Sequence, residues 1–380
     1  MKNLFIFSIL LITGFSLHAQ KKRSMNTISY LIAGTYTNGK SQGIYVYRFN
    51  TATGDATLVS VDTTDNPSYL AIAPDEKYVY AVNENGDKDN PGSIAAFSFD
   101  KTTGTLSLLN KQLSGGDHPC YVAIDNSGQW VTSGNYNGGS VAVLPIQKDG
   151  SLGEAVTIVQ HEGKGTDPQR QQKPHVHSTV FSPDHQQLLV PDLGTDKIVL
   201  YDFNGKNGSL IPSAQPFFKV QDGAGPRHLS FHPNGQFVYL MEEMAGNVVA
   251  FRYVNKKLEE LQTISSHPAD YTGKKGSADI HVSPDGKFLY ASNRMEANSI
   301  AVFSINPADG KLTLKGFHSS LGKTPRNFNF DPTGKFLLVA NQDTNEIVIL
   351  KRDIQTGLLT DTGKRVQVEK PVCIKWISSE

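Results

Sequence analysis

Four residues that lie far apart in the chain have side chains that could act together on a substrate: His177, Arg227, Glu243 and Arg294. An imidazole or a carboxylate can take a proton from water. A guanidinium matches the shape of a carboxylate or a phosphate and offsets negative charge. The set would suit acid–base chemistry on a substrate that carries or develops negative charge, provided that the fold brings the four together.

His177 lies in a stretch, residues 173–194 (KPHVHSTVFSPDHQQLLVPDLG), whose plan recurs along the chain. Each copy has an alternating segment, a turn containing Pro, Asp, Asn or Gly, a second apolar segment and polar residues at its end. Alternation with a period of two is typical of β-strands, and these residue types supply turn dihedrals. Five further copies begin at Asn66, His118, Gly225, Gly276 and Thr324.

Each copy is followed by two more predicted strands, so the repeating unit has four strands and about 50 residues. Such units are typical of propeller blades. The N-terminal part has three strands (28–34, 43–50 and 56–63) without an inner one, and residues 371–378 supply one strand without the rest. The sequence therefore predicts an all-β, seven-bladed β-propeller with four-stranded antiparallel blades. Residues 28–380 form this single domain, and the C-terminal strand joins the N-terminal blade, which closes the ring and removes exposed sheet edges.

Aligning the copies on their turn gives three columns of residues on one face of the predicted disc, because strand one begins and strand two ends there. The longest inter-blade loops (160–173, 218–225 and 266–276) lie on the same face. Six positions before the turn residue stand Ser68, Cys120, His177, Arg227, Ala278 and Arg326, with Val372 in the closing strand. Nine positions after it stand Asn83, Asn135, Asp192, Glu242, Asn293 and Asn341, and ten after it Glu84, Tyr136, Leu193, Glu243, Arg294 and Gln342.

The three columns call for different interpretations. The column that is mostly asparagine suggests side chains that bond a neighbouring blade's backbone. Asp192 and Glu242 depart from it, and we predict that they help to bind substrate, or else form salt bridges. The other two columns hold unlike residues, as expected of a functional face. The alternative is ion pairing between blades, for example of Arg227 with Glu243.

His175 and His177 are two residues apart on a predicted strand and so point the same way. With Asp192 or Glu243 they could form a metal site, but no third histidine is clearly placed nearby, and we predict no metal. His175 and Arg326 are assigned to substrate binding. No nucleophile elbow or phosphate-binding loop is present, and a lone Cys120 beside apolar residues is typical of packing.

Bulk composition narrows the partners and the compartment. The chain has 36 basic and 36 acidic residues, which gives no electrostatic reason to bind nucleic acid or an anionic membrane. Residues 1–19 have the pattern of a cleaved secretory signal, with an uncleaved anchor as the alternative, and residues 20–27 are a polar lead-in. We expect an exported protein, periplasmic or secreted, that is a monomer or weak oligomer without membrane contact after cleavage. Its two cysteines, Cys120 and Cys373, are not expected to pair.

The motifs PHVHSTVFSPD, VPDLGTDKI, GPRHLSFHPNGQFVY, DIHVSPDGKFLYASNR and PRNFNFDPTGKFLLVANQD resemble the seven-bladed β-propeller lactonase family, which includes 6-phosphogluconolactonases and carboxymuconate-lactonizing enzymes. The resemblance covers the repeats from about residue 28 to the end. It implies a propeller that needs no metal or organic cofactor. It also implies a catalytic histidine, two arginines and a glutamate, which fall on His177, Arg227, Arg294 and Glu243. Where relatives commonly have Asn-Glu, this chain has Glu242-Glu243.

The expected function is hydrolysis of a sugar-derived lactone, a small and anionic molecule. A 6-phosphogluconolactone is a cytosolic metabolite, so apparent export leaves the exact lactone open. The base could be His177 or Glu243, while Arg227 and Arg294 would hold the anionic group and the developing charge. Two alternatives remain: a carboxymuconate-type cycloisomerase, and a non-catalytic propeller that binds a glycan or protein. Convergence of the four side chains on one pocket would favour an enzyme.

Overall fold

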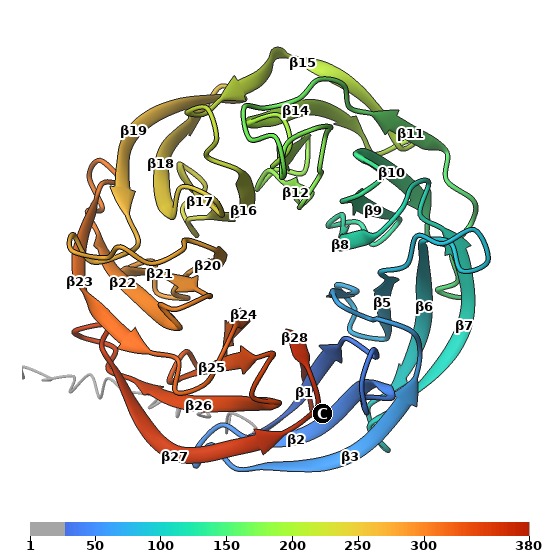
Figure 1. Ribbon diagram of the computed structural model, residues 1–380. Helices are drawn as coiled ribbons and strands as arrows, with labels where there is room; N and C mark the ends of the chain where they lie inside the picture. Colours follow the sequence, from blue (N-terminus) through green and yellow to red (C-terminus); the bar gives the residue numbers. More distant parts are fainter. Residues whose placement is uncertain (1–26, 380) are drawn as a thin grey trace, which may run out of the picture.

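The computed structural model describes residues 27–379, which form 28 β-strands in seven four-stranded antiparallel sheets arranged around a central axis (Figure 1). The predicted signal segment, residues 1–19, and all but the last residue of the lead-in lie outside the described residues. Within residues 27–379 no helix is long and apolar enough to cross a membrane. The predicted fold class is confirmed.

The blades are numbered from the N-terminus, and the four strands of each blade are named in order from the innermost, at the axis, to the outermost. The innermost strands of blades 1 to 7 are β28 (Pro371–Ser378), β4 (Leu70–Ile72), β8 (Pro119–Ile124), β12 (Val180–Phe181), β16 (Pro226–Phe231), β20 (Ser277–Val282) and β24 (Pro325–Phe330). The second strands are β1 (Ile28–Thr35), β5 (Tyr78–Asn83), β9 (Trp130–Asn135), β13 (Gln187–Asp192), β17 (Phe237–Glu242), β21 (Phe288–Asn293) and β25 (Phe336–Asn341).

The two outer strands of each blade complete the sheet. The third strands are β2 (Gly43–Asn50), β6 (Ser93–Asp100), β10 (Ser140–Pro145), β14 (Lys197–Asn204), β18 (Asn247–Val254), β22 (Ser299–Ile305) and β26 (Glu346–Arg352). The outermost strands are β3 (Ala56–Thr63), β7 (Thr105–Leu113), β11 (Thr157–Gln160), β15 (Ser209–Lys219), β19 (Lys257–Ser265), β23 (Leu312–Ser319) and β27 (Leu359–Gln367).

The two ends of the chain close the ring in blade 1, as predicted. The C-terminal strand β28, red in Figure 1, pairs antiparallel with the blue β1, with Ile32 opposite Lys375 and Ala33 opposite Ile374. Closure gives every blade the same four-stranded sheet, so β1 gains a partner on its axial side instead of presenting an exposed edge.

The apolar core lies between neighbouring blades, where nearly every residue of the second strands and most residues of the third strands are buried. Tyrosines of the second strands tie one blade to the next. Tyr80 donates to the backbone carbonyl of Gly150 (2.9 Å), and Tyr239 donates to that of Gly310 (2.9 Å). Because each carbonyl lies in a hairpin of the following blade, these bonds satisfy a buried hydroxyl and fix the spacing of the blades.

The asparagine column has the structural role that its regularity suggested. Asn135 Nδ2 donates to the carbonyl of Ser114, and Asn293 Nδ2 donates to that of Ser266. Each carbonyl belongs to the segment that leaves the preceding blade. The side chain therefore anchors the crossover between blades on the loop face.

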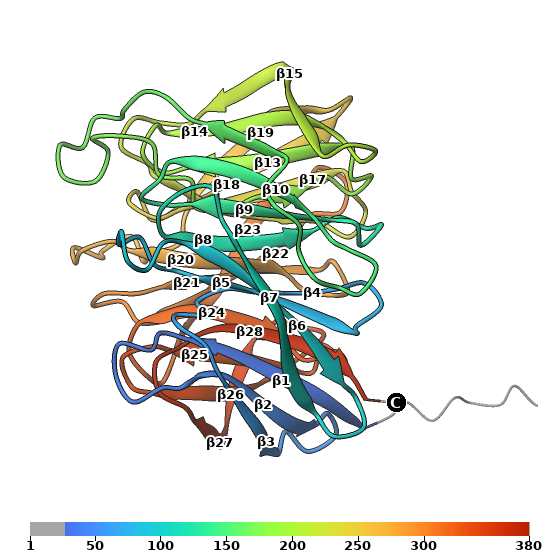
Figure 2. The ribbon, with the colours of Figure 1, turned by 90° about the vertical axis from the view of Figure 1, so that its right-hand side faces the viewer.

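The two faces of the disc differ (Figure 2). Short turns lie on the face from which the C-terminus leaves, and the longer inter-blade loops project from the opposite face. A typical turn is Pro284-Asp285-Gly286, in which Gly286 has a φ of 70°, and a Cβ there would lie 2.8 Å from the His232 ring. Glycine is therefore required at this turn. The loop face is where the candidate residues lie.

Candidate active site

The first column of the sequence register encircles one narrow cavity at the axis, whose volume of about 10 Å³ is close to what one water molecule needs. Its lining includes six of the seven predicted positions: Ser68, Cys120, His177, Arg227, Arg326 and Val372. The seventh, Ala278, lies alongside, since its carbonyl accepts a 2.6 Å hydrogen bond from Arg227 Nη1. The inner strands of the propeller thus bring unlike polar side chains from distant parts of the chain to a common point.

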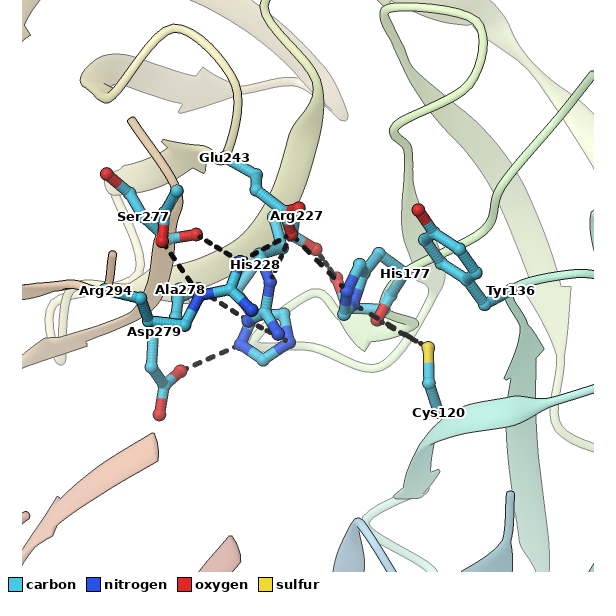
Figure 3. A network of polar contacts seen from close by, with 12 residues as sticks. Cys120, Tyr136, His177, Arg227, His228, Glu243, Ser277, Ala278, Asp279 and Arg294 are labelled. Carbon is cyan, nitrogen blue, oxygen red and sulfur yellow. Dashed lines mark hydrogen bonds and ion pairs between the residues drawn. The ribbon is translucent and has the colours of Figure 1, made fainter. Parts of the chain in front are cut away.

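Glu243 is the hub of the polar network beside this cavity (Figure 3). Its Oε2 lies 2.9 Å from Arg227 Nε, 3.2 Å from Arg294 Nη2 and 3.8 Å from His177 Nε2. Its Oε1 lies 2.7 Å from Nη2 of Arg170. The four residues selected from the sequence therefore meet, together with one more arginine.

The electrostatics of the network set the charge of its central groups. Burial acts to raise the pKa of Glu243, but Arg294, Arg227, His177 and Arg170 outweigh it and hold that pKa well below 4.5. Burial, with Arg227 next, holds the pKa of His177 well below 6.5. At neutral pH Glu243 is therefore a carboxylate and His177 a neutral imidazole.

Arg227 is 1% exposed and is held from behind by a chain of hydrogen bonds. Its Nη1 lies 3.2 Å from His228 Nε2, and His228 Nδ1 lies 2.8 Å from Asp279 Oδ1. Because a guanidinium only donates, His228 Nε2 must accept, so Nδ1 carries the proton and donates to Asp279. Arg227 Nη2 makes no hydrogen bond to any residue between 27 and 379, so its two N–H groups stay available beside the cavity.

The buried His228 makes the fold sensitive to acid. Burial, followed by the charge of Arg227, lowers its pKa to about 4, against about 6.5 in the unfolded chain. Because the folded pKa is the lower of the two, the unfolded chain binds more protons than the folded one between pH 6.5 and pH 4. The free energy of unfolding therefore falls as the pH falls through that range. The loss is of order 3 kcal/mol. We expect His228→Gln to reduce the fall in unfolding free energy over that range, as measured by urea denaturation at pH 7 and pH 4.5. An unchanged pH dependence would contradict this account of His228.

Arg294 serves mainly to hold Glu243. Its Nε donates to the carbonyl of Gly276 (2.8 Å), and its Nη2 donates to that of Ser277 (3.3 Å) as well as contacting Glu243. Burial lowers its pKa to about 10, with Glu243 acting in the opposite direction. The group remains a cation at neutral pH, and its contacts point it at the carboxylate rather than at the cavity.

His177 is enclosed on three sides by rings and sulfur. Tyr136 and His228 approach it edge-on, each with a centroid separation of 5.3 Å. Cys120 Sγ lies 3.7 Å from His177 Nδ1. Burial, followed by the charge of Glu84, raises the pKa of Cys120, so this thiol is protonated and is no nucleophile at neutral pH. Cys120 and Cys373 are both buried and free, as expected.

Two of the predicted substrate-binding residues lie away from the cavity. His175 stacks on Tyr136 with ring centroids 4.5 Å apart, and its Nδ1 lies 3.0 Å from the Tyr136 carbonyl oxygen. Asp192 occupies its column like the asparagines: it pairs with His161 of the preceding crossover (2.8 Å) and accepts from the backbone of His175 and Gly194. Its contacts organise the loop that carries the histidines.

Of the other two predicted substrate-binding residues, Glu242 and Arg326, only Arg326 lines the cavity. Glu242 is 2% exposed, and its Oε2 accepts a hydrogen bond from Asn247 Nδ2 at 3.2 Å, its one side-chain contact within residues 27–379. Burial raises its pKa to about 7, so it is partly protonated at neutral pH. Glu242 does not line the cavity. Arg326 does line it, as predicted.

The ion pair of Arg227 with Glu243 exists, but not between blades as the sequence suggested. Arg227 lies in β16 and Glu243 directly follows β17, and these two strands pair within blade 5. His177 from blade 4 and Arg294 from blade 6 come to the pair from either side. The network is thus centred on one blade and shared by its neighbours.

Sequence reasoning missed Arg170, which lies in the long loop before blade 4. Its Nη2 contacts both Glu243 and the hydroxyl of Tyr136 (3.1 Å), while its side chain remains 42% exposed. The loop is held by the fully buried Gln171, whose side chain bonds the Leu193 carbonyl and Asp196. In the sequence, the length of this loop was the one indication that it could carry a functional residue.

The donor set gives no sign of a metal centre. Within residues 27–379 no group of three or more His, Cys, Asp or Glu side chains could hold an ion. What the site offers is a neutral imidazole and guanidinium groups with unused N–H donors at one cavity, and an anchored carboxylate beside it. These groups can deprotonate water and stabilise an oxyanion.

Comparison with known proteins places this chain in a family. Residues 30–376 match the family described as "Lactonase, 7-bladed beta-propeller". A 6-phosphogluconolactonase of Bacillus subtilis is 39% identical over 90% of this chain and 97% of its own length. Another from Formosa agariphila is 40% identical over 87% of this chain and 94% of its own length. The structure of a periplasmic gluconolactonase of Pseudomonas aeruginosa is 38% identical, with a TM-score of 0.89 over 93% of this chain and all of that one.

Proposed function

Because the chain belongs to the seven-bladed β-propeller lactonase family, we propose that it hydrolyses a lactone bound over the axial cavity, with His177 as the base. The observation that carries the proposal is the joint presence, on one cavity, of a neutral imidazole and a guanidinium with unused donors. A water would lose its proton to the ring as it attacks the lactone carbonyl.

Arg227 is the proposed oxyanion donor. Attack of water on the carbonyl carbon places negative charge on the carbonyl oxygen, and Arg227 Nη2 is fixed at the cavity to receive it. When the tetrahedral intermediate collapses, the ring C–O bond breaks and the imidazolium returns its proton to the leaving oxygen. One lactone and one water thus give one hydroxy acid, with no other reactant.

Glu243 is assigned a supporting role in place of the base. A carboxylate with a strongly lowered pKa is a weak base, and both its oxygens already accept from arginines. Its Oε2 is 3.8 Å from His177, so it would stabilise the imidazolium that forms during the reaction. Arg294 and Arg170 keep that carboxylate in place.

We also propose that the protein acts outside the cytoplasm on a sugar-derived lactone. Its N-terminal sequence has the pattern of a signal, and one structural relative is periplasmic. Mass spectrometry of the exported protein should find Gln20 at its N-terminus. A protein that retains Met1 and stays in the cytoplasm would contradict this.

The function is tested by following pH change with a panel of lactones, each corrected for spontaneous opening. The panel contains glucono-δ-lactone, 6-phosphoglucono-δ-lactone and a carboxymuconolactone. We expect hydrolysis of at least one gluconolactone, and the pair shows whether phosphate is needed. Opening of the carboxymuconolactone without gluconolactone hydrolysis would favour a cycloisomerase. No rate above background on any of them would favour the binding platform.

A further inference from the structure

The wall of the cavity that faces away from Glu243 is polar too and has no part in the proposed hydrolysis. Ser68 before β4 and Arg326 in β24 line it, and they are in contact with Tyr36 after β1 and Glu84 after β5. Ser68 and Arg326 line the cavity directly, and Ser68 is 4% exposed. These residues come from blades 7, 1 and 2, opposite the blades that carry the catalytic candidates.

Glu84 is held on one side and open on the other. Its Oε2 accepts a hydrogen bond from Tyr36 Oη (2.8 Å) and a short one from Ser68 Oγ. Burial raises the pKa of Tyr36, so the phenol keeps its proton and stays a donor. Over the part of the chain that the structure describes, Oε1 of Glu84 accepts no hydrogen bond. The carboxylate is thus oriented but has acceptor capacity left.

Arg326 is the matching donor. Its guanidinium lies over the Tyr36 ring, 5.3 Å from the centroid, and forms no hydrogen bond or ion pair with residues 27–379. Burial acts to lower the pKa of Arg326, but Tyr36 and Glu84 outweigh it and raise that pKa. The guanidinium and the Glu84 carboxylate both contact Tyr36, the first at its ring and the second at its hydroxyl, so the two charged groups lie near each other. Its donors are therefore unused and face the cavity.

A carboxylate and a guanidinium side by side, each with unfilled hydrogen-bonding positions, are complementary to two adjacent hydroxyl groups. A hydroxyl both donates and accepts, so each one can donate to Glu84 and accept from Arg326. An unsubstituted ring would instead leave two desolvated charged groups without partners, which is costly. We propose that Glu84 and Arg326, oriented by Tyr36 and Ser68, bind adjacent hydroxyls of the substrate and select polyhydroxylated lactones. This inference rests on the proposed lactonase function.

The test compares two neutral six-membered lactones, glucono-δ-lactone with its hydroxyls and δ-valerolactone without them. We expect the wild-type ratio of kcat/KM values to be at least about 100, because a site built to bond a hydroxyl strongly rejects an analogue that lacks it. Glu84→Gln and Arg326→Gln should each reduce this ratio at least tenfold, chiefly through KM for glucono-δ-lactone. Since Arg326 makes no hydrogen bond to the described part of the chain, its variant is expected to fold even if Glu84→Gln does not.

Glu162→Gln is the matched control, because it removes the same charge from an exposed residue of the loop face and should leave the ratio unchanged. If the wild type opens glucono-δ-lactone but the Glu84 and Arg326 variants keep its ratio, the hydroxyl-binding wall is wrong and the lactonase proposal stands. If the wild type opens neither lactone nor any of the panel, the lactonase proposal itself fails.

Discussion

Replacement of His177 with asparagine is expected to lower kcat for lactone hydrolysis by about a thousandfold, with a smaller effect on KM. A positioned base contributes roughly 10²- to 10⁴-fold. Asparagine keeps a polar group of similar size but cannot accept the proton from water. The other groups at the cavity are poor substitutes, because Glu243 has a strongly lowered pKa and the Cys120 thiol is protonated.

The measurement is steady-state hydrolysis followed by pH change, with thermal melting to show that the variant is folded. His185→Asn is the control, since this half-buried histidine contacts the backbone of Asn126 on the turn face. A His177→Asn rate within threefold of the wild type would rule out His177 as the base. The neutral state of His177 further predicts that wild-type kcat/KM falls with acid only well below pH 6.5.

Replacement of Arg227 with alanine is expected to reduce kcat/KM by about 10²- to 10³-fold, the usual cost of losing one oxyanion donor. The same change leaves Glu243 with Arg294 and Arg170, so the carboxylate keeps two of its partners. Arg227→Lys should recover little, because an ammonium cannot contact Glu243, the Ala278 carbonyl and the cavity at once.

Arg365→Ala is the matched control, since Arg365 pairs with Asp361 on the outermost strand of blade 7, far from the axis. It should leave kcat/KM unchanged. Full activity in Arg227→Ala with normal melting would show that Arg227 carries no transition-state charge. Recovery of most of the rate in Arg227→Lys would show that a positive charge is enough and that the planar guanidinium with its several N–H donors is not needed.

The sequence predicted the propeller and the cavity lining because both depend on repetition. Once the copies are aligned on their turns, strand geometry decides which position of each copy reaches the axis, and six of seven such positions do line the cavity. Repetition is less informative where one copy is distorted. The inner strand of blade 4 comprises only Val180 and Phe181, with a single bridge from Val176 to Asp192.

Other parts of the site could not be predicted, since they depend on contacts outside the repeat. Arg170 lies in an inter-blade loop outside the aligned segments of the repeat, so no register places it over Glu243. Asp192 departs from its asparagine column, and this suggested function; instead it bonds His161 of the crossover, as the asparagines bond backbone carbonyls there. Glu84 was in the right column, but its importance depends on Tyr36, which no repeat aligns with it.

The most direct test of the central claim, that the axial cavity is a lactonase active site, is the rate of glucono-δ-lactone opening by the wild type and by the His177→Asn/Arg227→Ala double variant. We predict a wild-type rate far above spontaneous opening. We also predict that the double variant loses little more than the worse single variant, because the two residues act on the same step. A double variant that folds and opens the lactone at the wild-type rate would place the chemistry elsewhere in the molecule.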